Sequence, residues 1–382
     1  MITTSHLKPG IPQVEYYAPR LRVISGGRVL SSEVMGDVLQ VKVTMKKNAM
    51  TTFNLSLSNW EDNISGSPRF KYSDSNTFDI GTELRIELGY ADELIALVNA
   101  QVNSLSPKFP ESGTPTIDVS GTNAIFRLKG SKPQKEDQLS FVDKTDWQIA
   151  QLIAARNRLP IQVTREGPIH NQVVQKRDQD DASFLLDRAK RIEFDVFMQP
   201  DRNGRDTLYF VKPQDGRDAS PIMVFDFKWG ENLIEFSPKQ SASDQVSSVT
   251  VKGWDPKTKT PIEYTATDRD LPITGGSGKS GPSTAKAISP RGKADVIVDA
   301  SVLSEEEARR LAVSRLARRA YQYKTGSGRV IGQPKMRPGD NVNLSGLGKR
   351  FSGMWHITQV DHSFGGSGFT TSFQVERLRE NA

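Results

Sequence analysis

Histidines are the side chains in this sequence best suited to acid–base or metal chemistry. His356, Asp361 and His362 lie close together, whereas His6 and His170 stand apart. Residues 356 and 362 are an even number of positions apart, so on one strand both rings are expected to face the same side. A metal-dependent enzyme or a cell-wall hydrolase built around them is therefore one interpretation. The zinc-enzyme spacing His-Glu-x-x-His is missing, which favours structural roles for these histidines.

A glycine-rich segment resembles a phosphate-binding loop in part. That loop reads Gly-x-x-x-x-Gly-Lys-Ser. Residues 278–280 supply its Gly-Lys-Ser end, but Ile273 stands where the first glycine is needed. Gly281 and Pro282 follow, and we expect no helix to begin immediately there. Residues 275–290 are therefore predicted to form a flexible loop that orders only against a partner.

Acidic residues offer no better candidate for chemistry. Asp178, Asp180 and Asp181 have the right type for a cation site, but a helix that begins near Asp181, with this residue as its N-cap, accounts for them. The Gly-x-Ser-x-Gly motif of serine hydrolases is absent. Nothing singles out a catalytic pair among the 45 acidic residues. We predict no catalytic residue, no cofactor-binding residue, no cofactor and no metal site.

The composition limits the class of protein. The chain has 382 residues and no cysteine, which excludes disulfides and thiolate metal sites. Its apolar runs are shorter than the roughly 18–20 residues of a membrane-spanning helix. Residues 1–19 hold three prolines and no apolar core, so we expect neither a signal peptide nor a membrane partner.

The net charge of +6 raises the possibility of nucleic-acid binding. The 51 basic residues are nearly balanced by 45 acidic ones, and the two kinds alternate along the chain. A nucleic-acid-binding protein usually has a basic stripe interleaved with aromatic residues. The densest basic cluster instead lies on one predicted helix and consists of Arg309, Arg310, Arg315, Arg318 and Arg319. An acidic protein surface or a solvated helix face is favoured over nucleic acid, and a nucleic-acid-binding β protein remains an alternative.

Most of the chain alternates between apolar and polar residues. Residues 39–45, 53–57 and 84–90 show the pattern most clearly, which indicates strands with one buried and one solvated face. This pattern is typical of antiparallel sheets. Further strands are expected at Leu21–Val23, Ile117–Ser120, Thr207–Val211, Val249–Lys252, Asn341–Leu344, Trp355–Val360 and Thr370–Glu376.

Three helices are predicted between these strands. The first spans residues 146–158, where Thr145 and Gln148 have the spacing of a capping box. The second spans residues 181–193. The third spans residues 305–323; Ser304 and Glu307 form its capping box, and Gly326 is expected as its C-cap.

The C-terminal segment resembles a known family. Residues 332–377 are similar to the end of the phage late control D family, the baseplate hub proteins of contractile tails. The matching positions are Gly332, Pro334, Arg337-Pro338-Gly339-Asp340, Phe351-Ser352-Gly353, Trp355, Ile357-Thr358, His362, Thr371, Phe373 and Arg377. Asp180 and Phe184 lie in a second matching stretch, residues 178–186. Gly253 lies in a third, residues 245–255, which resembles the strand that opens the second barrel of the family.

The resemblance implies a β-rich α+β fold with two related antiparallel β-barrels and helix-containing insertions. Residues 1–130 would form the first barrel, completed by strands near 205–240, and residues 131–204 an inserted α/β domain with two helices. Residues 241–382 would form the second barrel, with the flexible loop 275–290 and the inserted helix 305–323. The matched residues are interpreted as turns and core aromatics rather than as an active site.

The resemblance also implies a function in assembly. Hub proteins share their fold with the hub part of type VI secretion spike proteins and with the T-even phage hub. The expected protein is a homotrimer with a pseudo-sixfold ring that joins a hexameric tail tube to a trimeric spike. The spike is expected to be a separate chain, because this sequence ends after the last hub strand. Other baseplate components are expected partners, and assembly is expected in the bacterial cytoplasm before incorporation into a phage tail or injection particle.

Overall fold

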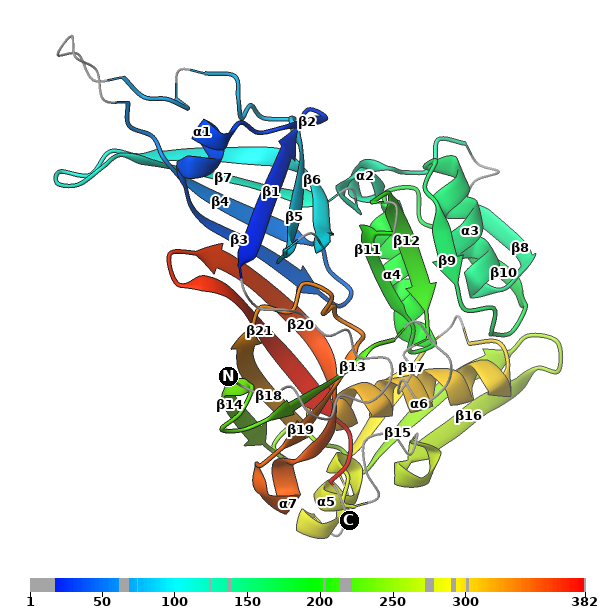
Figure 1. The fold of residues 1–382 in the computed structure, drawn as a ribbon. Coiled ribbons are helices and arrows are strands. Elements are labelled where there is room, and N and C mark those ends of the chain that lie inside the picture. The colour runs from blue at the N-terminus through cyan, green and yellow to red at the C-terminus, as the bar shows by residue number, and fades with distance from the viewer. Residues whose placement is uncertain are drawn as a thin grey trace.

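A computed structural model gives the fold of the chain. It describes residues 18–61, 69–73, 75–91, 93–123, 125–135, 139–201, 204–212, 222–271, 278–289, 293–299 and 302–380. Antiparallel strands dominate these residues, and helices are few (Figure 1). The β-rich character predicted from the period-two pattern is therefore confirmed.

One large sheet runs through most of the molecule. Its thirteen strands, counted over the described residues, fall into two halves. The N-terminal half consists of β1 (Pro19–Ser25), β2 (Arg28–Val29), β3 (Val38–Lys46), β4 (Thr52–Ser58), β5 (Glu83–Tyr90), β6 (Glu93–Lys108) and β7 (Thr116–Asn123). The C-terminal half consists of β13 (Val224–Lys228), β14 (Leu233–Gln240), β18 (Lys324–Ile331), β19 (Asn341–Ser345), β20 (Gly353–Gly365) and β21 (Gly368–Arg377). Two short helices, α1 (Ser32–Gly36) and α7 (Gly348–Phe351), interrupt these strands.

The two halves meet where β3 pairs with β20. This antiparallel pairing, which we call the β3–β20 seam, places Val43 opposite His362. From the seam, β4, β7, β6 and β5 continue on one side, and β21, β18 and β14 continue on the other. Two hydrophobic clusters follow the same division, one under each half.

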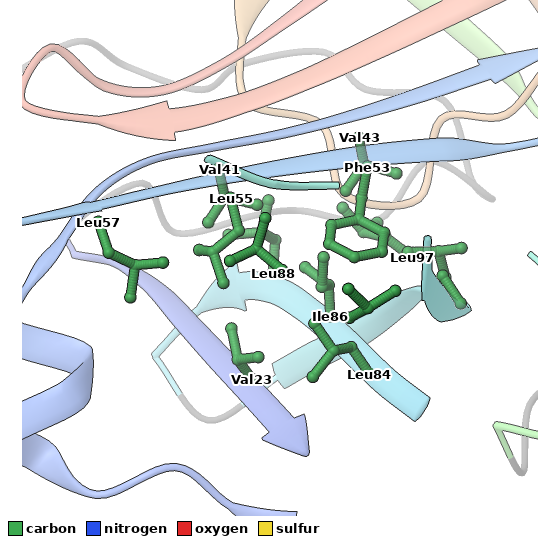
Figure 2. Packing of buried hydrophobic residues seen from close by; sticks show 14 of the residues in the cluster. Val23, Val41, Val43, Phe53, Leu55, Leu57, Leu84, Ile86, Leu88 and Leu97 are labelled. Carbon is green, nitrogen blue, oxygen red and sulfur yellow. The ribbon is translucent and has the colours of Figure 1, made fainter. Parts of the chain in front are cut away.

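Alternation explains the core of the N-terminal half. Val41 and Val43 on β3 are fully buried while Lys42 between them is exposed, as the period-two pattern requires. Figure 2 shows these side chains facing Ile86 and Leu88 of β5, so the sheet curls round its own core.

Residues 125–211 form a separate α/β unit. Its elements are α2 (Ile125–Gly130), β8 (Ser140–Lys144), α3 (Asp146–Arg156), β9 (Ile161–Val163), β10 (His170–Val174), α4 (Asp181–Arg191), β11 (Asp195–Pro200) and β12 (Asp206–Val211). Helices α3 and α4 share one hydrophobic cluster with β11 and β12. The capping box of α3 is confirmed, because Thr145 and Gln148 exchange hydrogen bonds with each other's backbone.

A separate three-stranded sheet is formed by the segment that lies between β14 and β18 along the chain. It has the order β16-β15-β17, and α6 covers one of its faces. The elements are β15 (Ser248–Asp255), β16 (Thr260–Thr267), the 3-10 helix η2 (Asp268–Asp270), α5 (Gly281–Ile288), β17 (Ala294–Val298) and α6 (Glu305–Tyr321). None of the helices in the described ranges is long and apolar enough to cross a membrane.

Strand pairing differs from the expected domain division. β13 and β14, which lie within residues 205–240, pair with β19 and β18 of the C-terminal half and not with strands of residues 1–130. β12 pairs with β11 inside the α/β unit. β15 does not open a second barrel, because its partners are β16 and β17. Local patterns reveal strands, but they do not reveal partners distant in sequence.

Helix ends also differ from the sequence expectation. Asp180, rather than Asp181, caps α4: its carboxylate accepts a hydrogen bond from the Ser183 N–H at 2.7 Å. Gly326 lies inside β18, and Gln322 is the C-cap of α6. The last turns predicted for residues 157–158, 192–193 and 322–323 are not helical.

The segment 275–290 is not a loop throughout. Residues 281–288 form α5, which begins exactly where no helix was expected, although residues 275–277 and 290 lie outside the described residues. Ser280 caps this helix, and its hydroxyl accepts from the Ser283 N–H at 3.1 Å. Pro282 is tolerated because the first turn of a helix needs no internal N–H bond.

Candidate functional site

Some of the residues that matched the family motif lie together in one connection between two strands. Gly332, Pro334, Pro338, Gly339 and Asp340 lie in the connection between β18 and β19, which we call the motif loop (residues 332–340). His362 and Phe373 lie on the strands beside it, β20 and β21.

The other matched residues lie elsewhere. Phe351, Gly353 and Trp355 surround the start of β20. Asp180 and Phe184 belong to α4 of the α/β unit, and Gly253 to β15. The structure therefore does not unite the matched residues into one site.

Asp340 holds the base of the motif loop. Its two carboxylate oxygens accept hydrogen bonds from the backbone N–H groups of Met223 (3.0 Å) and Arg337 (2.8 Å). Burial raises the pKa of Asp340 to about 7, although both hydrogen bonds oppose the shift. Gly339 has φ +95°, a conformation that favours glycine, and its N–H donates to Ile357. The Pro-Gly-Asp turn thus anchors β13, β19 and β20 to one another.

Arg337 ties the motif loop to the other half of the sheet. One terminal nitrogen donates to the carbonyls of Pro334 (2.7 Å) and Met336 (2.9 Å), and the other donates to the carbonyl of Ala96 on β6 (3.2 Å). Burial lowers the pKa of Arg337 to about 10, so it remains charged at neutral pH.

Two further contacts fasten the motif loop to the hairpin of β5 and β6. The Tyr90 hydroxyl donates to the Gly332 carbonyl at 3.0 Å, and Lys335 pairs with Glu93 at 2.6 Å. A Cβ atom at Gly332 would lie 2.2 Å from the Phe369 ring, so only glycine fits without rearrangement. The motif loop is therefore a brace between the two halves of the sheet.

His362 belongs to this brace. Its Nε2 lies 3.2 Å from the Met336 carbonyl, and its Nδ1 lies 3.1 Å from the Thr371 hydroxyl. Burial lowers the pKa of His362 to about 3, so the ring is neutral, with the Nε2 proton donated to Met336. The ring therefore joins β20 to the motif loop through Met336.

His356 and His362 do not face one another. His356 pairs with Glu376 and His362 with Thr371, and these partners are an odd number of positions apart on β21. The cause is a register shift between Ile357 and Gln359, a β-bulge that reverses the alternation. The expectation that both rings share one side of the strand is therefore wrong.

The environment of His356 is also unlike that of a metal ligand. Its Nδ1 lies 3.2 Å from the Asn341 side-chain oxygen, and burial lowers its pKa to about 3. Within the part of the chain that the structure describes, no three His, Cys, Asp or Glu side chains are placed to hold a metal ion. Two of the acidic residues considered for a cation site make structural contacts instead. Asp180 caps α4, and the buried Asp181 pairs with Arg156.

Aromatic residues of the motif fill the C-terminal half. Trp355 is 1% exposed, and its Nε1 donates to the Phe351 carbonyl at 3.0 Å. The buried Arg377 guanidinium lies over the Trp355 ring, 5.6 Å from its centroid. Phe373 stacks on Phe227 at 6.2 Å. These side chains form part of the core of the C-terminal half.

The basic helix α6 is partly internal. Arg309 and Arg315 are exposed. Arg310 pairs with Glu306 at 2.7 Å and Arg319 with Asp295 at 2.6 Å, and both of these arginine side chains remain partly exposed. The arginine side of the helix therefore contacts solvent, as expected for a solvated helix face. The helix packs against β15 and β16 as well as α4, because its small and apolar residues occupy more than one side.

A buried charged cluster at the β3–β20 seam was not foreseen from the sequence. Lys47 follows β3 and lies 3.3 Å from Asp195 of β11 and 3.7 Å from Glu376 of β21. Burial lowers the pKa of Lys47, but the two carboxylates outweigh that effect and raise it overall. Burial also raises the pKa of the neighbouring Glu193 to about 7. The sequence offered only one signal, the Lys-Asn turn between two strands; Asn48 there has φ +55°.

The fold is that of phage tail proteins. The 43 kDa tail protein of prophage MuSo2 from Shewanella oneidensis superimposes with a TM-score of 0.68 at 16% identity, over 94% of this chain and 99% of that one. A tail protein from Neisseria meningitidis gives 0.67 at 12% identity, over 94% and 97%. The E. coli c3393 protein, a type VI secretion component, gives 0.55 at 11% identity, over 91% and 74%.

Sequence comparison gives a family with a different description from the late control D family that the motifs resemble. No curated protein matches the chain. The model of the family described as Alg8 N-terminal domain matches residues 17–365, which is most of the sequence. The chain therefore belongs to the Alg8 N-terminal domain family, and it has the fold of the tail proteins above.

Proposed function

We propose that the chain is a structural hub component of a contractile tail or injection system. The observation that carries the proposal is the likeness to the Shewanella prophage tail protein, which extends over 94% of this chain and 99% of that one. A likeness of this extent involves the α/β unit and the α6-covered sheet as well as the large sheet. The proposed function is therefore assembly with other proteins of the particle, without catalysis.

The two-part sheet suits an adaptor between symmetries. Each half carries its own hydrophobic cluster, and the halves join through the β3–β20 seam. Three copies would therefore present six sheet halves around an axis. Such a ring would match a hexameric tail tube on one side and a trimeric spike, made by a separate chain, on the other.

Exposed apolar residues could form contacts between subunits in such a ring. Strand β17 is an edge of its sheet, and Val296 and Val298 on its outer face are 55% and 80% exposed. Trp254, on the neighbouring β15, is also exposed. An edge strand with apolar side chains is a surface that assembled proteins cover. The proposed partners are two further copies, the tube, the spike and other baseplate components, in a particle assembled in the bacterial cytoplasm.

Sedimentation of the purified chain tests the proposal. The expected species is a trimer, or a monomer that becomes a trimer as concentration rises, since the ring interface would be obligate in the particle. A species that stays monomeric at the highest soluble concentration, or one that forms closed dimers, contradicts the trimeric hub.

A further inference from the structure

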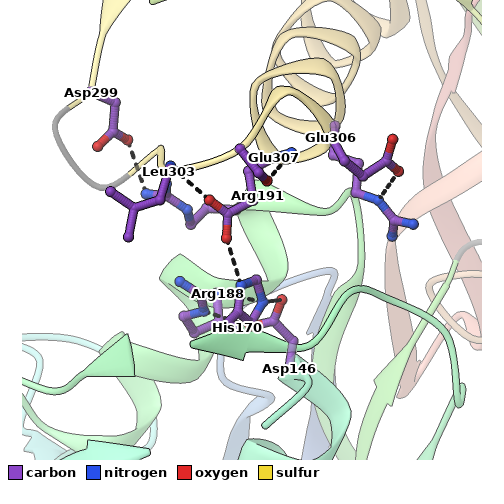
Figure 3. A network of polar contacts seen from close by, with 10 residues as sticks. Asp146, His170, Arg188, Arg191, Asp299, Leu303, Glu306 and Glu307 are labelled. Atoms are coloured by element: carbon purple, nitrogen blue, oxygen red, sulfur yellow. Dashed lines mark hydrogen bonds and ion pairs between the residues drawn. The ribbon is translucent and has the colours of Figure 1, made fainter. Parts of the chain in front are cut away.

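A cluster of four charged side chains lies where the α/β unit meets helix α6. His170 of β10 is at its centre and is 6% exposed. Its Nδ1 lies 2.8 Å from a carboxylate oxygen of Glu307, and its Nε2 lies 3.0 Å from a carboxylate oxygen of Asp146. Arg188 of α4 donates to the other oxygen of Asp146 at 2.5 Å (Figure 3). Among the contacts of this cluster, the one between His170 and Glu307 crosses between the two parts of the molecule; nearby, Arg191–Asp299 and the Ser314 hydroxyl on the Lys190 carbonyl cross as well.

Both carboxylates belong to helix N-termini. Asp146 is the first residue of α3, and Glu307 lies in the first turn of α6. The partial positive charge of a helix N-terminus stabilises an ionised carboxylate there. The pKa of Asp146 and that of Glu307 both lie below their usual values. Burial opposes these shifts, but the hydrogen bonds to His170 together with the charge of Arg188 outweigh it, and for Glu307 the Leu303 N–H adds to them. Two anions therefore face the imidazole ring from opposite sides.

Charge balance decides the state of the ring. With Asp146 and Glu307 ionised, Arg188 supplies one positive charge, and a protonated His170 supplies the second. Loss of the histidine proton would leave an uncompensated negative charge in a mostly buried cluster, which is costly. A neutral ring also keeps only one N–H group, so it cannot donate to both carboxylates.

The other charged groups around His170 are paired with partners of their own or lie at the edge of the cluster. Arg188 Nη2 is 3.0 Å from His170 Nε2 and opposes protonation, but this single cation faces two carboxylates. On α4, Arg191 pairs with Asp299 at 3.0 Å. On α6, Glu306 pairs with Arg310. Lys144 of β8 stands opposite His170 in the strand pair and is partly exposed.

We propose that His170 is a proton-dependent clasp between the α/β unit and helix α6. The protonated ring bridges Asp146 and Glu307 and holds the two parts together. Deprotonation leaves Glu307 with a weaker, neutral donor and frees the first turn of α6 from the α/β unit. The clasp is independent of the oligomeric state, so it stands apart from the proposed function.

The direction of the pH dependence follows from the pKa shifts. Burial lowers the pKa of His170, but the hydrogen bonds to Asp146 and Glu307 outweigh it and raise the pKa above 6.5. A raised histidine pKa stabilises the folded contact below the unfolded value, and this contribution is lost as pH rises through the folded value. The lowered pKa values of Asp146 and Glu307 stabilise the contact above their unfolded values of 3.8 and 4.5. The clasp is therefore strongest between pH 4.5 and pH 6.5 and weakens on the alkaline side.

Hydrogen exchange of the full chain tests the clasp. Exchange is measured by mass spectrometry near pH 5.5 and near pH 8.5, corrected for the intrinsic rate, in peptides that cover residues 168–174 and 303–310. We expect these two segments to open severalfold more at the higher pH. His170→Gln should be open at both pH values, and its exchange should not change with pH. Glu306→Gln, which alters the neighbouring charge on the same helix, should behave as the wild type.

A second readout separates the clasp from a merely structural role. The ring of His170 is followed by NMR, which is practical because the chain has four histidines. Glu307→Gln should lower the pKa of His170, whereas Glu306→Gln should leave it in place. Exchange in the wild type that does not vary with pH, or a His170→Gln variant that keeps the wild-type pH dependence, overturns the proposal. An unchanged His170 titration in Glu307→Gln overturns it as well.

Discussion

Asp340 shows how one side chain can join distant segments of a fold. It is 7% exposed and satisfies two backbone N–H groups from segments more than one hundred positions apart, Met223 and Arg337. Its raised pKa is the consequence of burial in a turn.

Removal of the Asp340 carboxylate is predicted to destabilise the protein. Asp340→Ala should lower the free energy of unfolding by about 2–4 kcal/mol, because two buried N–H groups lose their acceptor. The control is Asp255→Ala: Asp255 also accepts from two backbone N–H groups, Lys257 and Thr258, but in an exposed turn. Denaturant unfolding should show a clearly smaller loss for the control, because water can replace the carboxylate at an exposed turn. Equal losses would contradict the role given to Asp340.

The same variant carries a pH signature. The folded pKa of Asp340, about 7, lies above its usual 3.8, so the folded state holds this proton more tightly than the unfolded chain. The stabilisation from that proton is therefore lost as pH rises from about 4 to about 7. The penalty of Asp340→Ala should be larger near pH 5 than near pH 8. A penalty that does not change with pH would show that the carboxylate is ionised in the folded protein throughout.

Gly253 is predicted to resist substitution for steric reasons. A Cβ atom there would lie 2.4 Å from the Val302 carbonyl oxygen and 2.9 Å from the Val302 side chain. Gly253→Ala should cost about 1–3 kcal/mol through overpacking. Gly36→Ala is the control, since nothing lies within 4 Å of a Cβ atom at that helical position. Thermal unfolding of the two variants distinguishes them, and a stable Gly253→Ala protein would contradict this packing.

At the scale of elements, helix α5 shows that glycine and proline do not always prevent a helix. Gly281 and Pro282 predict that no helix begins there, yet Pro282 lies in the first turn of α5, where no backbone N–H is required. Ser280, fully buried, makes the start of the helix, and its hydroxyl also bonds to Asp268. The signal was present in the sequence as a serine three positions before another serine, a weak form of the capping box.

Loss of this cap is predicted to loosen α5. Ser280→Ala should destabilise the protein by about 1–2 kcal/mol and raise hydrogen exchange within residues 281–288. Ser31→Ala removes an exposed N-cap from the short helix α1 and should have a smaller effect on unfolding. If residues 281–288 exchange equally in wild type and Ser280→Ala, the cap is not what holds the helix.

The sequence predicted those elements whose signals are local. The strands around Val41 and Leu55, and the helix capped by Thr145, lie where the periodicity and the capping residues place them. The bulge near Thr358 could not be foreseen, because one extra residue in a strand leaves no mark in the period-two pattern and reverses every later side chain. The prediction that His356 and His362 face the same side of the strand is wrong because of this bulge.

At the scale of the molecule, strand partners decide the architecture. β13 pairs with β19 across more than one hundred residues, and β3 pairs with β20 across more than three hundred. Such pairs are set by the packing of the whole chain, which single-segment patterns do not contain. The charged groups at the unit boundaries, Lys47 and His170, escaped prediction because their partners come from other units.

The central claim is that three copies form one ring with six similar sheet halves. Single-particle electron microscopy of the purified chain tests it most directly. The account predicts ring-shaped particles in which three chains surround a central opening and their six sheet halves alternate around it. Particles that stay monomeric at the highest soluble concentration, open filaments or rings of any other symmetry would contradict the account.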